Sequence, residues 1–169
     1  FNYLKNIYPR YFKKIGVSVY TNEELEALLS DDLISVVQLP FNMLDNANLR
    51  ATMLMALKDS GKEIHTRSCF LQGLFFKDSN ALPEKLEPLR FYLDEIKSIA
   101  NDNKLDIGHL ALQYCLTKPY IDKVLIGVES MEQLNLNLQW SSVVIKAEAL
   151  LAIDQINVAT IELLNPSKW

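Results

Sequence analysis

The chain has 169 residues, of which 49% are apolar and 22% charged, and its mean hydropathy is +0.03. This composition is typical of one globular domain and excludes disordered and collagen-like chains. The net charge is −4 and no basic run exceeds Lys13-Lys14, which argues against nucleic acid or a membrane surface as a partner. Cys69 and Cys115 have neither disulfide-framework nor zinc-ligand spacing, and Phe1–Lys5 does not open a signal peptide, so no metal and a cytoplasmic location are expected.

Short apolar runs alternate with longer segments of helical periodicity, which predicts βα units with parallel strands buried on both faces. Strands are predicted at 15–20, 33–39, 63–68 and 124–128. The first helix is predicted to follow the capping box of Thr21 and Glu24, and the others cover about 48–60, 83–101, 106–116, 130–137 and 147–159. Pro40 is expected to close the second strand, and Gly61 to cap the helix before the third.

The arrangement of these elements predicts one domain, because the chain has no linker and no internal repeat beyond the βα alternation. Four parallel strands, each followed by a helix, fit either a small open doubly wound sheet or half of an eight-stranded barrel. Periodicity alone does not separate these two folds. The loop from Gly73 to Asn80 is long for a βα connection, and such loops are frequently functional.

Four stretches at predicted strand ends resemble the aldo/keto reductases. They are Ile15-Gly16-Val17-Ser18-Val19-Tyr20, Val37-Gln38-Leu39-Pro40-Phe41-Asn42, Arg67-Ser68-Cys69-Phe70-Leu71-Gln72-Gly73-Leu74, and Ile126-Gly127-Val128-Glu129-Ser130 with Gln133 and Asn137. The resemblance covers about Lys13 to Trp169 and implies an α/β fold, half of a (β/α)8 TIM barrel in which residues 13–169 form strands 5 to 8 with their helices. Residues 1–12 are then expected to be the remnant of the preceding helix and its loop.

The resemblance also implies a function. Family members are oxidoreductases that transfer hydride between NADP or NAD and a small carbonyl compound or sugar. The family's catalytic Asp, Tyr, Lys and His have no counterpart in this chain, so the chain is expected to be the cofactor-binding half of a longer enzyme and inactive by itself. A non-catalytic nucleotide-binding or regulatory protein on the same scaffold is the alternative.

Cofactor contacts are assigned by the resemblance to eleven residues. At the nicotinamide end, Ser18 and Gln38 would meet the carboxamide, and Arg67 would stack on the nicotinamide ring or pair with a phosphate. The loop residues Ser68, Phe70 and Gln72 would fold over the pyrophosphate, and a helix N-terminus would face phosphate or ribose at Gly127, Glu129 and Ser130. At the other end, Gln133 and Asn137 would contact adenine. Five of them have a structural alternative: packing for Ser18, an interior hydrogen bond for Gln38, a salt bridge for Arg67, completion of the capping box for Gln133 and simple solvent exposure for Asn137.

Two further expectations concern charge and association. The segment from Val124 to Trp140 contains no Lys or Arg but does contain Glu129 and Glu132. A carboxylate repels the 2′-phosphate of NADP, so this composition predicts that NAD is accepted better than is usual in the family. A half-barrel would also leave two sheet edges unpaired and an apolar inner face exposed, which predicts self-association.

Overall fold

The computed structural model describes residues 11–169, so most of the predicted remnant over 1–12 lies outside the described residues. Its centre is a four-stranded parallel sheet in the order β1-β2-β3-β4. The strands are β1 (Gly16–Ser18), β2 (Val36–Pro40), β3 (Glu63–Arg67) and β4 (Lys123–Val124). Sequential strands are neighbours, and helices connect them, so the α/β fold with four parallel strands and alternating helices is confirmed.

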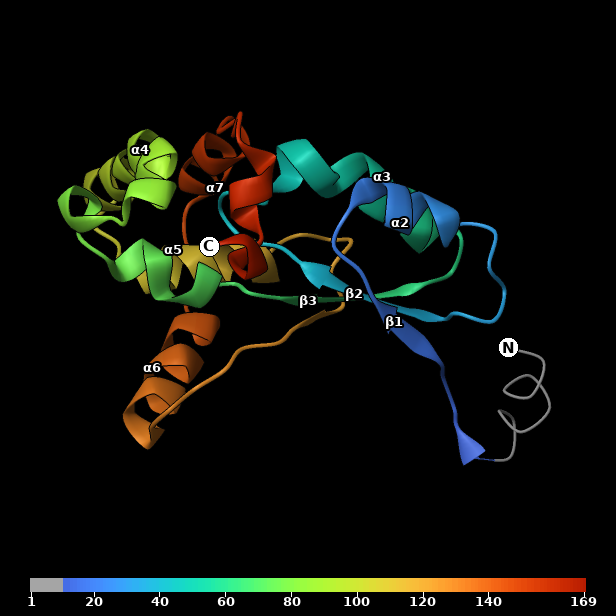
Figure 1. Ribbon diagram of the computed structural model, residues 1–169. Helices are drawn as coiled ribbons and strands as arrows, with labels where there is room; N and C mark the ends of the chain where they lie inside the picture. Colours follow the sequence, from blue (N-terminus) through green and yellow to red (C-terminus); the bar gives the residue numbers. More distant parts are fainter. Residues whose placement is uncertain (1–10) are drawn as a thin grey trace.

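Helices occupy every connection between the strands, and two further helices follow β4. They are α2 (Asn22–Ala27), α3 (Ala47–Asp59), α4 (Arg90–Asp102), α5 (Ile107–Leu116), α6 (Met131–Ser142) and α7 (Ala147–Asp154). In Figure 1, α2, α3 and α7 lie on one side of the sheet, whereas α6 stands away from it beyond the end of β4. Short 3-10 turns cover 71–76, 79–81 and 84–89 in the long connection after β3. Within residues 11–169, no helix has the length and apolar character needed to cross a membrane.

Burial alternates along the strands, which corrects the expectation that both faces of the sheet are buried. Val37, Leu39 and Ile64 are fully buried under the helices. Their neighbours on the opposite face, such as Gln38 and His65, are only half-buried. That face is also polar rather than apolar, because alternate residues of β3 are charged or polar. We call it the open face of the sheet, and self-association through its edges stays a prediction.

Local signals for helix ends are largely confirmed. At α2 the side chain of Thr21 accepts from the Glu24 amide (3.2 Å), and the Glu24 carboxylate accepts from the Thr21 amide (2.9 Å). At the end of α3, Gly61 adopts φ +83° and its amide donates to Lys58 O (2.8 Å). Glycine follows the cap residue here because the left-handed backbone disfavours a Cβ atom.

Several predicted boundaries were wrong. The predicted helix 83–101 is divided into a 3-10 turn and α4, since Pro88 has no amide proton to donate. The fourth strand covers Lys123–Val124 instead of 124–128, because its pairing with β3 stops at Thr66 and Val124. Helix α6 continues to residue 142 instead of 137, and α7 ends at 154 instead of 159. The second strand begins at 36 instead of 33 and includes Pro40 as its last residue.

Candidate nucleotide-binding groove

A groove opens where the carboxyl ends of β3 and β4 meet the start of α6. It encloses about 700 Å³, a volume typical of small-molecule sites. One wall is the loop after β3, and the other is the segment after β4 together with one face of α6. Seven of the eleven predicted cofactor residues line it, namely Ser68, Phe70, Gln72, Gly127, Glu129, Gln133 and Asn137. The fold therefore brings together two groups of residues that are about 60 positions apart in the sequence.

The wall after β3 is a strained loop. Ser68 (φ +62°), Leu71 (φ +45°) and Gln72 (φ +53°) all adopt left-handed backbone conformations, and Gly73 follows at φ +79°. Each non-glycine residue in such a conformation costs roughly 1–3 kcal/mol, and the strain persists only where the surroundings fix it. Here the Leu71 amide donates to Ser68 O (2.9 Å), and the Leu71 side chain is fully buried. Such concentrated strain is a feature of binding loops.

The opposite wall begins at the N-terminus of α6. The Ser130 hydroxyl accepts from the Gln133 amide (3.2 Å), as its capping position predicts. The Gln133 side chain, however, accepts from the Glu129 amide (2.8 Å) and not from that of Ser130. The helix dipole still points its positive end toward the groove, which favours a phosphate or ribose there. The Glu129 amide itself is occupied in this conformation.

Asn137 is the most informative residue of this wall. It is only 6% exposed and lines the groove. Within residues 11–169 its side-chain amide forms no hydrogen bond, and the amide atoms themselves are open to the groove. This amide is therefore available to a ligand that enters the groove.

Trp140 forms the apolar end of the groove, one helical turn beyond Asn137. Its ring lies so close to Gly108 of α5 that an alanine Cβ at position 108 would come within 2.4 Å of it. The Gln113 amide of α5 donates to Trp140 O (2.7 Å) and holds the end of α6 in place. Trp140 was not predicted as a site residue, although its spacing from Gln133 and Asn137 places all three on one helix face.

The remaining predicted residues lie outside this groove. Ser130 caps α6 beside it, while Ser18 and Gln38 face each other on the open face of the sheet, 3.5 Å apart between the hydroxyl and the amide oxygen. Arg67 also belongs to the open face, and its guanidinium lies 4.4 Å from the centre of the Tyr20 ring. The structure thus divides the predicted set into groove residues and open-face residues, which meet where Arg67 is followed by Ser68.

The charges around the groove are few. Glu129 is the charged side chain in its lining, and the lining contains neither Lys nor Arg. On the open face, Lys123, Lys14 and His65 surround Glu63 and hold the pKa of its carboxyl well below the usual range. Within residues 11–169, no group of His, Cys, Asp and Glu side chains is arranged to hold a metal ion. A ligand of the groove would therefore be recognised by hydrogen bonds, stacking and the helix dipole.

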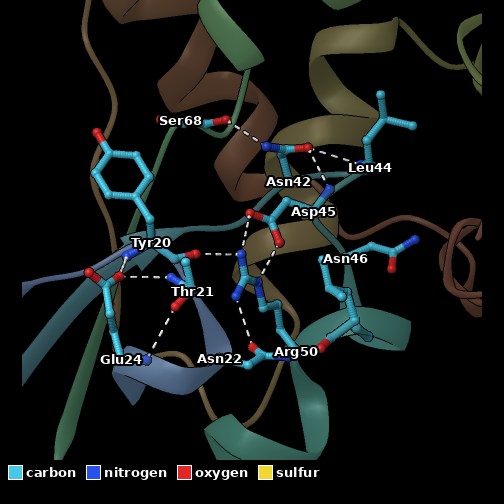
Figure 2. A network of polar contacts seen from close by, with 12 residues as sticks. Tyr20, Thr21, Asn22, Glu24, Asn42, Leu44, Asp45, Asn46, Arg50 and Ser68 are labelled. Carbon is cyan, nitrogen blue, oxygen red and sulfur yellow. Dashed lines mark hydrogen bonds and ion pairs between the residues drawn. The ribbon is translucent and has the colours of Figure 1, made fainter. Parts of the chain in front are cut away.

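A buried polar network beside the site was missed in the sequence (Figure 2). Asp45 and Arg50 form an ion pair in which the guanidinium donates to both carboxylate oxygens at 2.5 and 3.0 Å, and both side chains are almost fully buried. Burial raises the pKa of Asp45, against the opposing effect of Arg50. Asn42, two residues beyond β2, donates to Ser68 O (3.3 Å). In the sequence, this network could have been suspected from the polar residues that cluster after the second strand.

Comparison with known proteins identifies the family of this α/β chain. The sequence profile of the aldo/keto reductase family matches residues 12–158. The chain belongs to the aldo/keto reductase family. The resemblance based on four strand-end stretches is therefore confirmed at the level of the family. A comparison with curated protein sequences found no match.

Solved aldo/keto reductase structures share the fold. The chain is 20% identical to the holo form of aldo-keto reductase AKR11C1 from Bacillus halodurans, with a TM-score of 0.71, covering 91% of this chain and 54% of that one. The apo form of the same protein gives 19% identity, the same coverage and the same TM-score. The thermostable aldo-keto reductase Tm1743 in complex with the inhibitor epalrestat gives 20% identity and a TM-score of 0.65, over 92% of this chain and 52% of that one. The chain spans about half the length of these structures.

Proposed function

We propose that this chain is the cofactor-binding, C-terminal half of the barrel of an NAD(P)-dependent aldo/keto reductase, with β1 to β4 as strands 5 to 8. The proposed reaction is hydride transfer between the nicotinamide and a small carbonyl compound or sugar. Family membership supports an oxidoreductase, and the span of about half a related chain is consistent with half a barrel. The family's catalytic Asp, Tyr, Lys and His have no counterpart here, so we expect the 169-residue chain to bind cofactor without turnover.

Asn137 carries the proposal for the adenine end of the cofactor. The residue is 6% exposed, and its amide lacks a partner in residues 11–169 and opens onto a groove of suitable volume. An amide has two donor hydrogens and one acceptor oxygen, which match the edge of an adenine base. Trp140, one turn further along α6, offers an aromatic surface to the same ligand.

The pyrophosphate and nicotinamide would continue from the groove onto the open face. The N-terminus of α6 and the loop that begins at Ser68 lie on opposite sides of the groove, where amide groups and the helix dipole favour an anion. Ser18 and Gln38 lie on the open face, and their hydroxyl and amide groups suit a carboxamide. Arg67 stands between these two regions and would meet either the phosphate or the nicotinamide ring.

Charge in the groove favours NAD over NADP. The 2′-phosphate of NADP needs a basic partner, and none of the groove-lining residues is Lys or Arg. Glu129 instead places a carboxylate at the start of α6, which repels that phosphate by on the order of 1 kcal/mol or more and accepts from ribose hydroxyls. We therefore propose that NAD is tolerated better than is usual in the family.

The test is calorimetric titration of the 169-residue chain with ADP and with 2′,5′-ADP, which carry the adenine end of NAD and of NADP. We expect ADP to bind and Asn137→Ala to weaken its binding about tenfold, the effect of one lost hydrogen bond. Asn135→Ala is the matched control, because Asn135 is an exposed asparagine of the same helix. Equal effects of the two substitutions, or no ADP binding, would reject the assignment of the groove.

The same titration tests cofactor choice. We expect 2′,5′-ADP to bind more weakly than ADP, and Glu129→Gln to reduce the difference. Binding of 2′,5′-ADP tenfold tighter than ADP, unchanged in Glu129→Gln, would contradict the preference for NAD while leaving the groove itself supported.

A further inference from the structure

A single network of largely buried contacts connects the carboxyl ends of three strands (Figure 2). It begins after β1, where the Arg50 guanidinium donates to Tyr20 O (2.7 Å). It passes through the ion pair between Asp45, in the connection between β2 and α3, and Arg50, in the first turn of α3. It ends after β3, where the Asn42 amide donates to Ser68 O (3.3 Å). Asn42, Asp45 and Arg50 are at most 5% exposed, and the bonds to Tyr20 O and Ser68 O are partly buried, so competition from solvent is reduced.

The geometry of this network of contacts requires arginine at position 50. Its Nε and one terminal nitrogen bind the two oxygens of Asp45, and that terminal nitrogen also reaches Tyr20 O. The other terminal nitrogen donates to Asn22 Oδ1 (2.8 Å) at the start of α2. A planar guanidinium supplies these donors at fixed angles, whereas the single ammonium of lysine does not. One buried side chain thereby holds the turn after β1 against the turn after β2.

Asn42 connects the ion pair to the loop after β3. Its side-chain oxygen accepts from the amides of Leu44 (2.9 Å) and Asp45 (3.0 Å), which fixes the turn that carries Asp45. Its side-chain nitrogen donates to the carbonyl of Ser68, the first left-handed residue of the strained loop. Ser68 therefore has a partner on a neighbouring strand end at the point where the chain turns into the groove.

Tyr20 connects the other end of the network to Arg67. While its carbonyl is held by Arg50, its ring lies under the Arg67 guanidinium at 4.4 Å. Arg67 and Ser68, the two residues where the open face meets the groove, are therefore held from two sides by the same network.

We propose that Asn42, Asp45 and Arg50 are positioning residues that set Arg67 and Ser68, and through them the loop wall of the nucleotide groove. This inference rests on the proposed function for its effect on ligand binding, but not for its effect on the loop. A purely structural network would change global stability and leave the loop and the groove as they are in the folded state.

The test compares Asn42→Ala and Arg50→Lys with Tyr114→Phe. Tyr114 also stabilises α3, since its hydroxyl accepts from the Ala47 amide (2.8 Å), but it has no contact with the loop after β3 among its described interactions. The first readout, which needs no ligand, is hydrogen exchange of the Leu71 and Gly73 amides, both bonded within the loop. The second is the affinity for ADP, measured well below the melting temperature of every variant.

We expect Asn42→Ala and Arg50→Lys to speed exchange at Leu71 and Gly73 at least tenfold and to weaken ADP binding about tenfold. Tyr114→Phe is expected to lower the melting temperature without either change. In the background Ser68→Gly, which accepts a positive φ without strain, Asn42→Ala is expected to have a smaller effect on exchange. Faster exchange when even the unaltered chain binds no ADP would reject the proposed function but support the positioning role. Unchanged exchange in both network variants would overturn the positioning role.

Discussion

Gly108 allows α6 to approach α5, and Gly108→Ala is the perturbation with the clearest structural magnitude. The new Cβ atom would lie 2.4 Å from two ring carbons of Trp140 and 3.3 Å from Phe76 Cε1. Packed carbon atoms are normally about 3.5–4.0 Å apart, so the indole would have to move by roughly 1 Å. It cannot do so freely, because Gln113 holds Trp140 O and the His109 Nε2 atom lies 2.7 Å from Val143 O.

Two opposing effects decide the sign of this prediction. Overpacking costs about 1–3 kcal/mol, whereas replacing glycine by alanine in a helix gains at most about 1 kcal/mol. We therefore expect a net loss of roughly 1–2 kcal/mol, with a fall in melting temperature of about 2–4 °C for each kcal/mol. The gain is smaller than usual because Gly108 lies in the first turn of α5.

The assay is urea unfolding combined with the fluorescence of Trp140, in a Trp169→Phe background so that a single indole reports. Gly127→Ala is the matched control, since no atom lies within 4 Å of the position that its Cβ would occupy. We expect Gly108→Ala to lose stability and shift the emission maximum, and Gly127→Ala to do neither. Equal or greater stability of Gly108→Ala with unchanged emission would refute the packing argument.

Three further substitutions are tested by the same unfolding assay. Tyr114→Phe removes the hydroxyl that donates to Asp154 (2.5 Å), and we expect a loss of about 1–3 kcal/mol; a neutral result would show that water replaces the hydroxyl. Gly61→Ala places a Cβ in a left-handed position with open space around it, so strain alone should cost about 1 kcal/mol. Glu63→Gln is expected to destabilise at pH 7. Because the pKa of Glu63 is lowered in the folded chain, its contribution to the free energy of unfolding is present above about pH 4.5 and is lost on acidification. The stabilities of the variant and the parent should therefore converge at low pH, and a difference that stays constant with pH would contradict this.

The elements of the fold were predictable where a local signal determines them. The capping box at Thr21 depends on residues three positions apart, and the glycine after α3 depends on one backbone angle, so both can be read from sequence. The fourth strand could not be delimited, because its length depends on where its pairing with β3 stops. An apolar run such as 124–128 shows a tendency to form a strand but does not show how many residues find a partner.

The candidate site was predictable in part for a similar reason. Residues on one helix face, such as Gln133 and Asn137, remain together in any fold that contains the helix. The hydrogen bond from Asn42 to Ser68 joins two loops, and the hydrogen bond from Arg50 to Tyr20 joins helix α3 to a third loop, the one after β1. Such contacts depend on the order of strands in the sheet, which periodicity left open between an open sheet and a half-barrel.

Two kinds of buried asparagine distinguish support from recognition in this chain. Asn46 donates to the carbonyls of Ile153 (3.0 Å) and Ile156 (2.8 Å), and Asn42 uses both ends of its amide within the chain. Both side chains are almost fully buried and their amide nitrogens are bonded within the chain, so a ligand would have to break these bonds. Asn137 is 6% exposed, and its amide opens onto the groove with no partner in the described chain. Because this amide meets water in the groove, a ligand that pairs with it exchanges bonds to water for bonds to the protein, a net gain of about 0.5–1.5 kcal/mol for each bond. A ligand at Asn42 would first have to break bonds within the chain, which is the physical basis for placing recognition at Asn137 and positioning at Asn42.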